Sequence, residues 1–278
     1  MNNTSSYIHG SDSDEQRRLD TLNRLINASS LREMKLQGGE RVLDVGSGLG
    51  QLTRAIARKG GTVIGIERDP AQIAECRRLA ASHGEEGLIE VRQGDVAAFP
   101  LREDEWGTFD IAHSRFLLEH VPDPQAVVDQ MVKAARPGGR IILEDDDHDL
   151  LRLWPEPEGA YAVWDAYCKS YTAIGNDPLI GKKLGSYLHN AGARLNRATW
   201  IFFGASAGEQ EFPLYVDNLV GILEGARDHM IHARLITDEM FARGVDSLRS
   251  WKSRPDAVFW YARAWAEGAC PPKLASQA

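Results

Sequence analysis

The sequence predicts an α/β protein built on a doubly wound, mostly parallel sheet. Three observations lead to this prediction. Five short apolar segments alternate with helical ones between residues 41 and 144, and a glycine-rich turn follows the first of them. This alternation of strand-like and helical segments ends after Asp149. Strands separated by helices imply βαβ units, and therefore a parallel sheet. A chain of 278 residues fits one such domain with an attached cap.

The core elements follow one another at short intervals. The predicted strands are residues 41–45, 62–67, 88–92, 109–112 and 140–144. The predicted helices are residues 51–59, 70–82 and one that Asp123-Pro124 opens and Pro137-Gly138-Gly139 stops. Proline at a first helical position is favourable because its missing N–H would have no partner there.

The flanking segments are predicted to be a tail and a helical cap. Residues 1–15 are expected to form a flexible tail, followed by a helix over 15–27 and a second short helix near Leu31. Residues 16–278 are then one domain, with a cofactor-binding core at about 40–149 and cap insertions at about 150–192 and 205–255. Further strands are expected at 196–203 and 258–266, and further helices at 182–191, 214–230 and 237–251.

An aromatic stripe lies in the first cap insertion. Tyr161, Trp164, Tyr167 and Tyr171 recur at helical spacing. Simple helix packing is the favoured interpretation, and an aromatic surface for a substrate is the alternative.

Composition narrows the function classes. The net charge of −8 argues against a nucleic-acid partner or an anionic membrane surface. The three cysteines are widely spaced and form no CxxC pair, so neither a zinc ribbon nor a disulfide framework is indicated. Residues 1–16 lack the apolar segment of a signal peptide. We therefore expect a cytoplasmic protein.

The glycine-rich turn reads Gly46-Ser47-Gly48-Leu49-Gly50. Glycines let the backbone turn sharply and let a ligand approach without meeting a Cβ atom, while the helix N-terminus presents free N–H groups. A dinucleotide fingerprint would place its third glycine at position 51, where this chain has Gln51. The GxGxG spacing therefore disfavours a nicotinamide cofactor, although the turn alone is a weak signal.

Two carboxylates follow the next two strands. Glu67 ends the second strand, where it can accept hydrogen bonds from both hydroxyls of a ribose. Asp95 comes just after the third strand, where it can accept from an adenine amino group beside the Val96 N–H. Each acid alone could be a helix cap or a solvated loop residue. All three features fall at carboxyl ends of strands, the edge where open α/β sheets bind ligands.

Five segments follow one another over about residues 40–143: VLDVGSGLG, VIGIERD, VRQGDVAAFP, FDIAHSRFLLEHVPDP and ARPGGRIIL. As an ordered set they resemble the class I S-adenosylmethionine-dependent methyltransferases, especially the ubiquinone- and menaquinone-biosynthesis group. The resemblance implies a Rossmann-like sheet of seven strands whose last strand is antiparallel. It also implies S-adenosylmethionine as cofactor and S-adenosylhomocysteine as product. Ser47 stands where the family often has cysteine.

The resemblance also assigns residues to parts of the cofactor. The three glycines would surround the methionine portion, and Ser47 and Gln51 of the same loop join the candidate cofactor-binding residues. Glu67 would hold the ribose, Asp95 and Val96 the adenine, Arg68 would flank the adenine face, and Ser114 would lie near the sulfonium. The helix over 15–27 would close over the cofactor.

A proton acceptor is needed only if the methyl acceptor enters protonated. The candidates are His113, Glu119 and His120 after the fourth strand, and Asp145, Asp146 and His148 after the fifth. Of these we predict His120 and Asp145 as catalytic, with a structural cap as the favoured alternative role for His120.

The stretch Glu144-Asp145-Asp146-Asp147-His148-Asp149 raises a metal hypothesis because hard cations favour oxygen ligands. Successive strand residues point to opposite faces, so only every second side chain could share one ion. We favour a solvated loop, or a negatively charged surface that attracts a basic methyl acceptor. We therefore predict no bound metal.

Taken together, the sequence predicts methyl transfer from S-adenosylmethionine to a small-molecule oxygen, nitrogen or carbon, with no nucleic-acid or membrane partner and with a homodimer left open. A nicotinamide-dependent oxidoreductase and a non-catalytic S-adenosylmethionine-binding module are the alternatives.

Overall fold

The computed structural model describes residues 13–272, with side chains described from Leu22 onward. The predicted tail therefore lies outside the described residues up to position 12, and Ser13 already begins the first helix. Clustering of contacts divides the chain into two compact units. Among the described residues, one comprises 27–149, 176–201 and 263–272, and we call it the core unit. The other comprises residues 13–26, 150–175 and 202–262, and we call it the helical unit.

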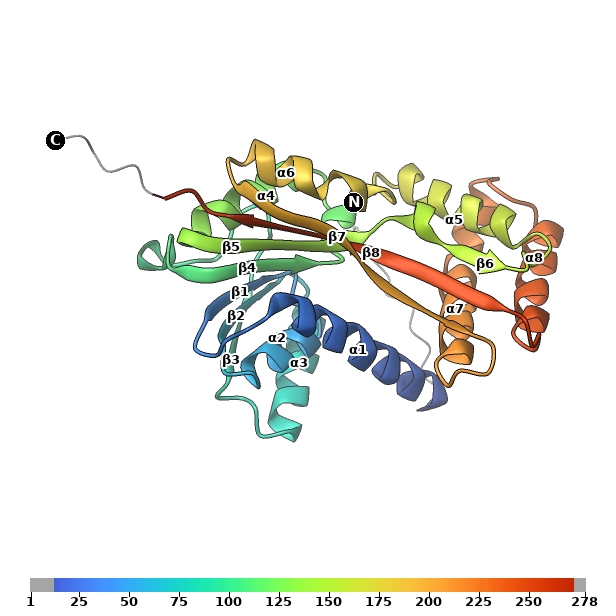
Figure 1. The fold of residues 1–278 in the computed structure, drawn as a ribbon, viewed down its shortest axis with the longest axis horizontal. Coiled ribbons are helices and arrows are strands. Elements are labelled where there is room, and N and C mark those ends of the chain that lie inside the picture. The colour runs from blue at the N-terminus through green and yellow to red at the C-terminus, as the bar shows by residue number, and fades with distance from the viewer. Residues whose placement is uncertain (1–12, 273–278) are drawn as a thin grey trace. The chain divides into compact units, whose positions relative to one another are not determined.

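The strands form one sheet in the order β3-β2-β1-β4-β5-β8-β6, with β7 paired to β8 (Figure 1). Strands β1 to β5 are parallel, whereas β8 runs antiparallel to β5 and to β6. The bounds are β1 Arg41–Val45, β2 Thr62–Glu67, β3 Ile89–Gln93, β4 Phe109–Arg115, β5 Ala135–Asp146, β6 Arg152–Trp154, β7 Arg194–Ser206 and β8 Val258–Ala269. The predicted fold class is confirmed, with β6 as a strand that the sequence analysis missed.

The helices alternate with the strands in the core unit and cluster in the helical unit. Their bounds are α1 Ser13–Met34, α2 Gln51–Ala57, α3 Pro70–Ser82, α4 Pro124–Ala134, α5 Ala160–Ala173, α6 Leu184–Asn190, α7 Phe212–His232 and α8 Asp238–Trp251. Short 3-10 turns η1 to η4 cover Glu103–Glu105, Leu118–His120, His148–Leu150 and Ile180–Lys183.

Alternation along the parallel strands buries both faces of the sheet. Val42 lies in one apolar cluster with Leu52 and Ile56 of α2, whereas its neighbour Leu43 lies in another with Met131 of α4. Both clusters consist of residues that are almost completely shielded from solvent. This two-sided burial explains why the strands read as continuous apolar runs, as parallel sheets covered on both faces do.

Several predicted boundaries differ from the structure, and two of these differences have a clear physical reason. The N-terminal region is one helix to Met34, because no glycine or proline interrupts residues 13–34 and the breakers Gly38 and Gly39 come later. The helix α4 ends at Ala134, and the strand begins at once with Ala135 paired to Phe109. Pro137 explains the earlier end, since the residue before a proline disfavours the helical conformation.

The aromatic stripe packs inside the helical unit. Trp164 stacks on Tyr167 with ring centroids 5.2 Å apart, and both are buried in one apolar cluster with residues of α7 and α8. The Tyr161 hydroxyl accepts a hydrogen bond from the Leu153 N–H at 2.8 Å. These contacts fit the favoured interpretation, helix packing.

Candidate functional site: a cofactor pocket at the carboxyl edge of the sheet

The glycine loop has the backbone conformation that only glycine adopts easily. Gly46, Gly48 and Gly50 have φ angles of 75°, 54° and 68°, in the left-handed region where a Cβ atom is strained. A Cβ on Gly50 would also lie 2.2 Å from the Cys76 Sγ. The GxGxG spacing thus lets the loop turn and lets α2 start at Gln51 against α3.

Hydrogen bonds join the glycine loop to the ends of β2 and β3. The Glu67 carboxylate accepts from the Gly48 N–H at 3.0 Å, and from the Arg68 and Asp69 N–H groups at 2.9 Å each. The Glu67 carbonyl accepts from the Gly94 N–H at 3.0 Å, directly before Asp95. The structure therefore brings together the loop and both acids that the sequence analysis singled out.

The loop at Asp95 and Val96 is held by a residue that the sequence analysis missed. The Gln130 side-chain amide donates to the carbonyls of Val96 and Ala97 at 3.0 and 2.9 Å, and its oxygen accepts from the Phe99 N–H at 2.9 Å. Asp95 itself is exposed and accepts from the Ala97 N–H. Gln130 lies on α4, far away in sequence, so no local signal could have revealed it.

The remaining cofactor candidates lie around this loop. Ser114 pairs in register with Val45, the residue before Gly46. The hydroxyls of Ser47 and Ser114 are both buried and accept or donate no hydrogen bond within the part of the chain that the structure describes. Arg68 is exposed beside Glu67. Buried hydroxyls without a hydrogen-bond partner beside a glycine loop are consistent with a site that binds a polar ligand.

His113 lies within β4 rather than on the loop where it was expected. It pairs in register with Asp44, and its Nδ1 lies 3.0 Å from the Asp44 carboxylate, completely buried. Burial acts to lower the pKa of His113, but the carboxylates of Asp44 and Glu144 outweigh it and raise that pKa above its usual value. Inside the strand, His113 acts as a buried bridge between neighbouring strands.

The predicted catalytic residues have contrasting surroundings. Asp145 is fully buried, and its carboxylate accepts from the Leu117, Leu118 and Asp146 N–H groups at 3.2, 2.8 and 3.1 Å. Burial, with Glu119 and Asp146 nearby, raises the pKa of Asp145 well above its usual value. His120 is partly exposed, with its Nε2 atom 3.3 Å from the Glu119 carboxylate.

Glu119 is buried between two histidines. Its carboxylate lies 3.3 Å from His120 and 3.5 Å from His148. Burial alone would raise the pKa of Glu119, but the two imidazoles lower it to about 2. Because β4 and β5 are parallel neighbours, Glu119 and His148 come from loops at the same edge of the sheet as the glycine loop.

The fold and this edge define the class: an open α/β sheet with a glycine loop and two carboxylates at its carboxyl edge. The family described as a methyltransferase domain matches residues 43–143. Residues 43–143 therefore match a methyltransferase domain, in agreement with the resemblance that the sequence motifs indicated.

A curated relative and two solved structures extend this result. A ubiquinone biosynthesis O-methyltransferase of Xylella fastidiosa strain 9a5c is 34% identical over 157 residues, 56% of this chain and 62% of that protein. The chain thus spans less than two thirds of that relative's length. A protein from Bacillus halodurans has a TM-score of 0.59 and 17% identity, and the match covers 88% of this chain and 98% of that one. A geranyl diphosphate methyltransferase in complex with S-adenosylmethionine has a TM-score of 0.53 and 16% identity, with 93% and 91% covered.

Proposed function

We propose that this protein transfers the methyl group of S-adenosylmethionine to a small-molecule acceptor and releases S-adenosylhomocysteine. The main support for this proposal is that hydrogen bonds join the glycine loop, Glu67 and the Asp95 loop within the matched methyltransferase domain. A similar structure is described as holding S-adenosylmethionine, which supports that cofactor for this pocket.

The residues of the pocket have complementary tasks. The loop from Gly46 to Gln51 would surround the methionine portion, since its glycines leave room for a ligand against the backbone. Glu67, which already gathers three N–H groups, retains acceptor capacity for ribose hydroxyls because a carboxylate has about four lone-pair sites. Asp95 and Val96 would hold the adenine, with Arg68 beside it and Ser114 toward the sulfonium.

The bound cofactor supplies an electrophilic methyl group on a cationic sulfonium. The protein must then position the acceptor atom in line with that group and remove a proton where the acceptor carries one. His120 is the better placed of the two predicted catalytic residues for proton removal, because it is partly exposed beside an ionised carboxylate. Asp145 would support it by holding Leu117 and Leu118, and thus the turn that carries Glu119 and His120.

We also propose the class of acceptor and the cellular compartment, from the net charge and the state of the cysteines. The net charge of −8 favours a small-molecule acceptor over nucleic acid or an anionic membrane surface. All three cysteines are free thiols, which fits a cytoplasmic protein. Among residues 13–272, no helix combines the length and apolar character needed to cross a bilayer. A homodimer stays a prediction.

The test is isothermal titration of the full chain with S-adenosylmethionine, S-adenosylhomocysteine and NADH in parallel. Micromolar binding of both sulfur nucleotides without NADH binding is expected. Binding of NADH alone would replace the proposal by the oxidoreductase alternative. Tight S-adenosylmethionine binding without turnover on any of a panel of phenols, amines and carbon acids would favour the non-catalytic binding module.

A further inference from the structure

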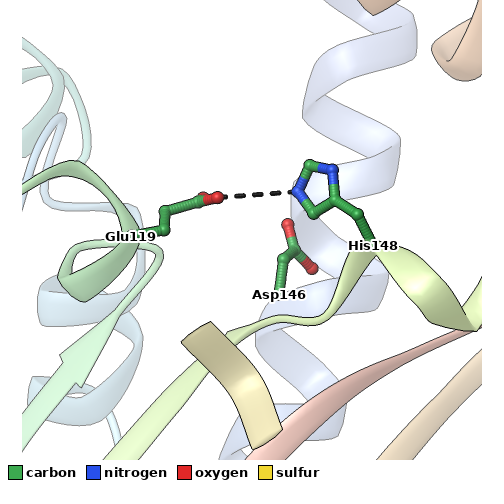
Figure 2. A group of neighbouring side chains, drawn as sticks. All are labelled: Glu119, Asp146 and His148. Carbon is green, nitrogen blue, oxygen red and sulfur yellow. Dashed lines mark ion pairs between the residues drawn. The ribbon is translucent and has the colours of Figure 1, made fainter. Parts of the chain in front are cut away.

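Three possible ligand side chains for a metal ion gather beyond the cofactor pocket (Figure 2). Glu119 lies in η2 after β4, Asp146 ends β5, and His148 begins η3. One ligand atom of each lies within 4.8 Å of those of the other two. Glu119 and His148 are buried and Asp146 is half-buried. An imidazole and two carboxylates thus converge from two neighbouring loops.

The other acids of the acidic stretch make contacts outside this group. Glu144 pairs with Arg263 at 2.9 Å, and Asp147 and Asp149 both pair with Lys182, at 3.6 and 2.6 Å. The carboxylate of Asp145 accepts from backbone N–H groups. Asp146 and His148 are two positions apart, on either side of the junction between β5 and η3.

The backbone around the group is fixed by hydrogen bonds from the loop 176–178. The Asp177 N–H donates to the Glu119 carbonyl at 2.9 Å, and the His148 N–H donates to the Pro178 carbonyl at 3.0 Å. One short loop therefore clamps the two segments that carry Glu119 and His148. Pre-positioned ligands of this kind lose little conformational freedom on binding an ion.

The Glu119 carboxylate has an oxygen with unused hydrogen-bonding capacity. Its Oε2 is buried and accepts no hydrogen bond from the described residues, and it lies 3.5 Å from the His148 Nε2. Figure 2 shows this carboxylate turned toward His148 and Asp146. A buried, incompletely satisfied carboxylate is costly, and a cation at this position would satisfy it.

We propose that Glu119, Asp146 and His148 bind one divalent transition-metal ion, of the Mn²⁺ or Zn²⁺ type. Imidazole and carboxylate oxygens are ligands that such ions share, and three protein ligands leave coordination positions open. In a further step that rests on the proposed function, an acceptor hydroxyl at an open position would lose its proton more easily. This proposal replaces our expectation from sequence that no metal is bound.

The test is a titration of the chelator-treated full chain with MnCl₂ alone, followed by electron paramagnetic resonance of the free ion. We expect one Mn²⁺ per chain. Asp146→Asn and His148→Gln should each weaken binding at least about tenfold, as loss of a ligand does at minimum. Asp149→Asn is the matched control, because it removes the same charge from the same stretch but at a residue that pairs with Lys182. It should bind Mn²⁺ as the unchanged protein does.

Two results would overturn the proposal: no saturable Mn²⁺ binding by the intact protein, or an equal loss in Asp149→Asn and Asp146→Asn, which would show attraction to the acidic stretch in general. Thermal melting of each variant confirms that it is folded before titration. A parallel titration with S-adenosylmethionine separates the two proposals. Cofactor binding without Mn²⁺ binding removes only the metal site, whereas Mn²⁺ binding without cofactor binding removes only the proposed function.

Discussion

Two buried glutamates at opposite ends of β4 show how the same side chain serves different purposes. Glu105 precedes the strand and Glu119 follows it, and the pKa of each is lowered to about 2. Glu105 owes this mainly to Arg92, whose guanidinium donates to both carboxylate oxygens at 2.6 and 2.8 Å. Glu119 owes it to His120 and His148, against the effect of burial.

The partners explain the difference between the two ends of β4. Arg92, near the end of β3, is always charged, and Arg41 and Arg102 also pair with Glu105, so permanent ion pairs hold the segment that precedes β4. Glu119 instead has titratable imidazoles as partners and the acids Asp145 and Asp146 as neighbours. We infer that the segment before β4 is built for stability and the carboxyl edge for binding and proton transfer. Four experiments test this contrast.

Glu105→Gln should have the largest effect, a loss of about 3 kcal/mol in the free energy of unfolding, because it removes the buried carboxylate that the mostly buried Arg92 contacts through two nitrogen atoms. The pKa of Glu105 is lowered on folding, so its contribution is complete above about pH 4.5 and is lost as the pH falls toward 2. Urea denaturation at pH 7 and pH 3 measures both effects. A variant as stable as the unchanged protein would contradict the stabilising role of these ion pairs.

His120→Ala should lower turnover by about 100-fold, the lower range for removal of a general base. The affinity for S-adenosylmethionine should not change, because His120 lies outside the hydrogen-bonded glycine loop. Steady-state kinetics and calorimetry measure the two quantities, with His189→Ala, a histidine of α6, as the control. A normal rate in His120→Ala would show that positioning alone suffices.

Glu67→Ala should weaken S-adenosylmethionine binding by about 2 kcal/mol, as expected for the loss of hydrogen bonds to a charged group. Glu75→Ala on α3 is the matched control, since that glutamate pairs with Arg78 on the helix surface. Calorimetry at one ionic strength gives both affinities. An unchanged affinity in Glu67→Ala would remove Glu67 from the pocket.

Asp145→Asn should have the smallest effect on stability, within about 1 kcal/mol at pH 7. The pKa of Asp145 is raised on folding, so ionisation opposes folding, and its favourable contribution is lost as the pH rises above 3.8. The neutral amide removes that opposition while keeping one acceptor for the N–H groups of the following turn. Denaturation at pH 5 and pH 7.5 checks this, and a loss as large as that of Glu105→Gln would erase the contrast between the two ends of β4.

Elements with a local cause could be predicted from the amino-acid sequence alone. The apolar strands 41–45 and 62–67 and the helix opened by Pro70 were predicted to the residue, because alternation, helix caps and glycine spacing act over a few positions. The order of the glycine loop, Glu67 and Asp95 likewise follows from strand ends, which the chain marks directly. These features make up the proposed cofactor site.

Contacts between side chains that are distant in sequence depend on tertiary packing and could not be predicted. The short strand β6, the clamp of Gln130 on the Asp95 loop and the buried pair of Asp44 and His113 depend on packing between separate segments. The sequence showed five acids and one histidine in a row, but not that Asp146 and His148 meet Glu119 from the neighbouring strand. The reason is physical: strand register and loop contacts, which no local pattern encodes, set the distances between side chains that are far apart in the chain.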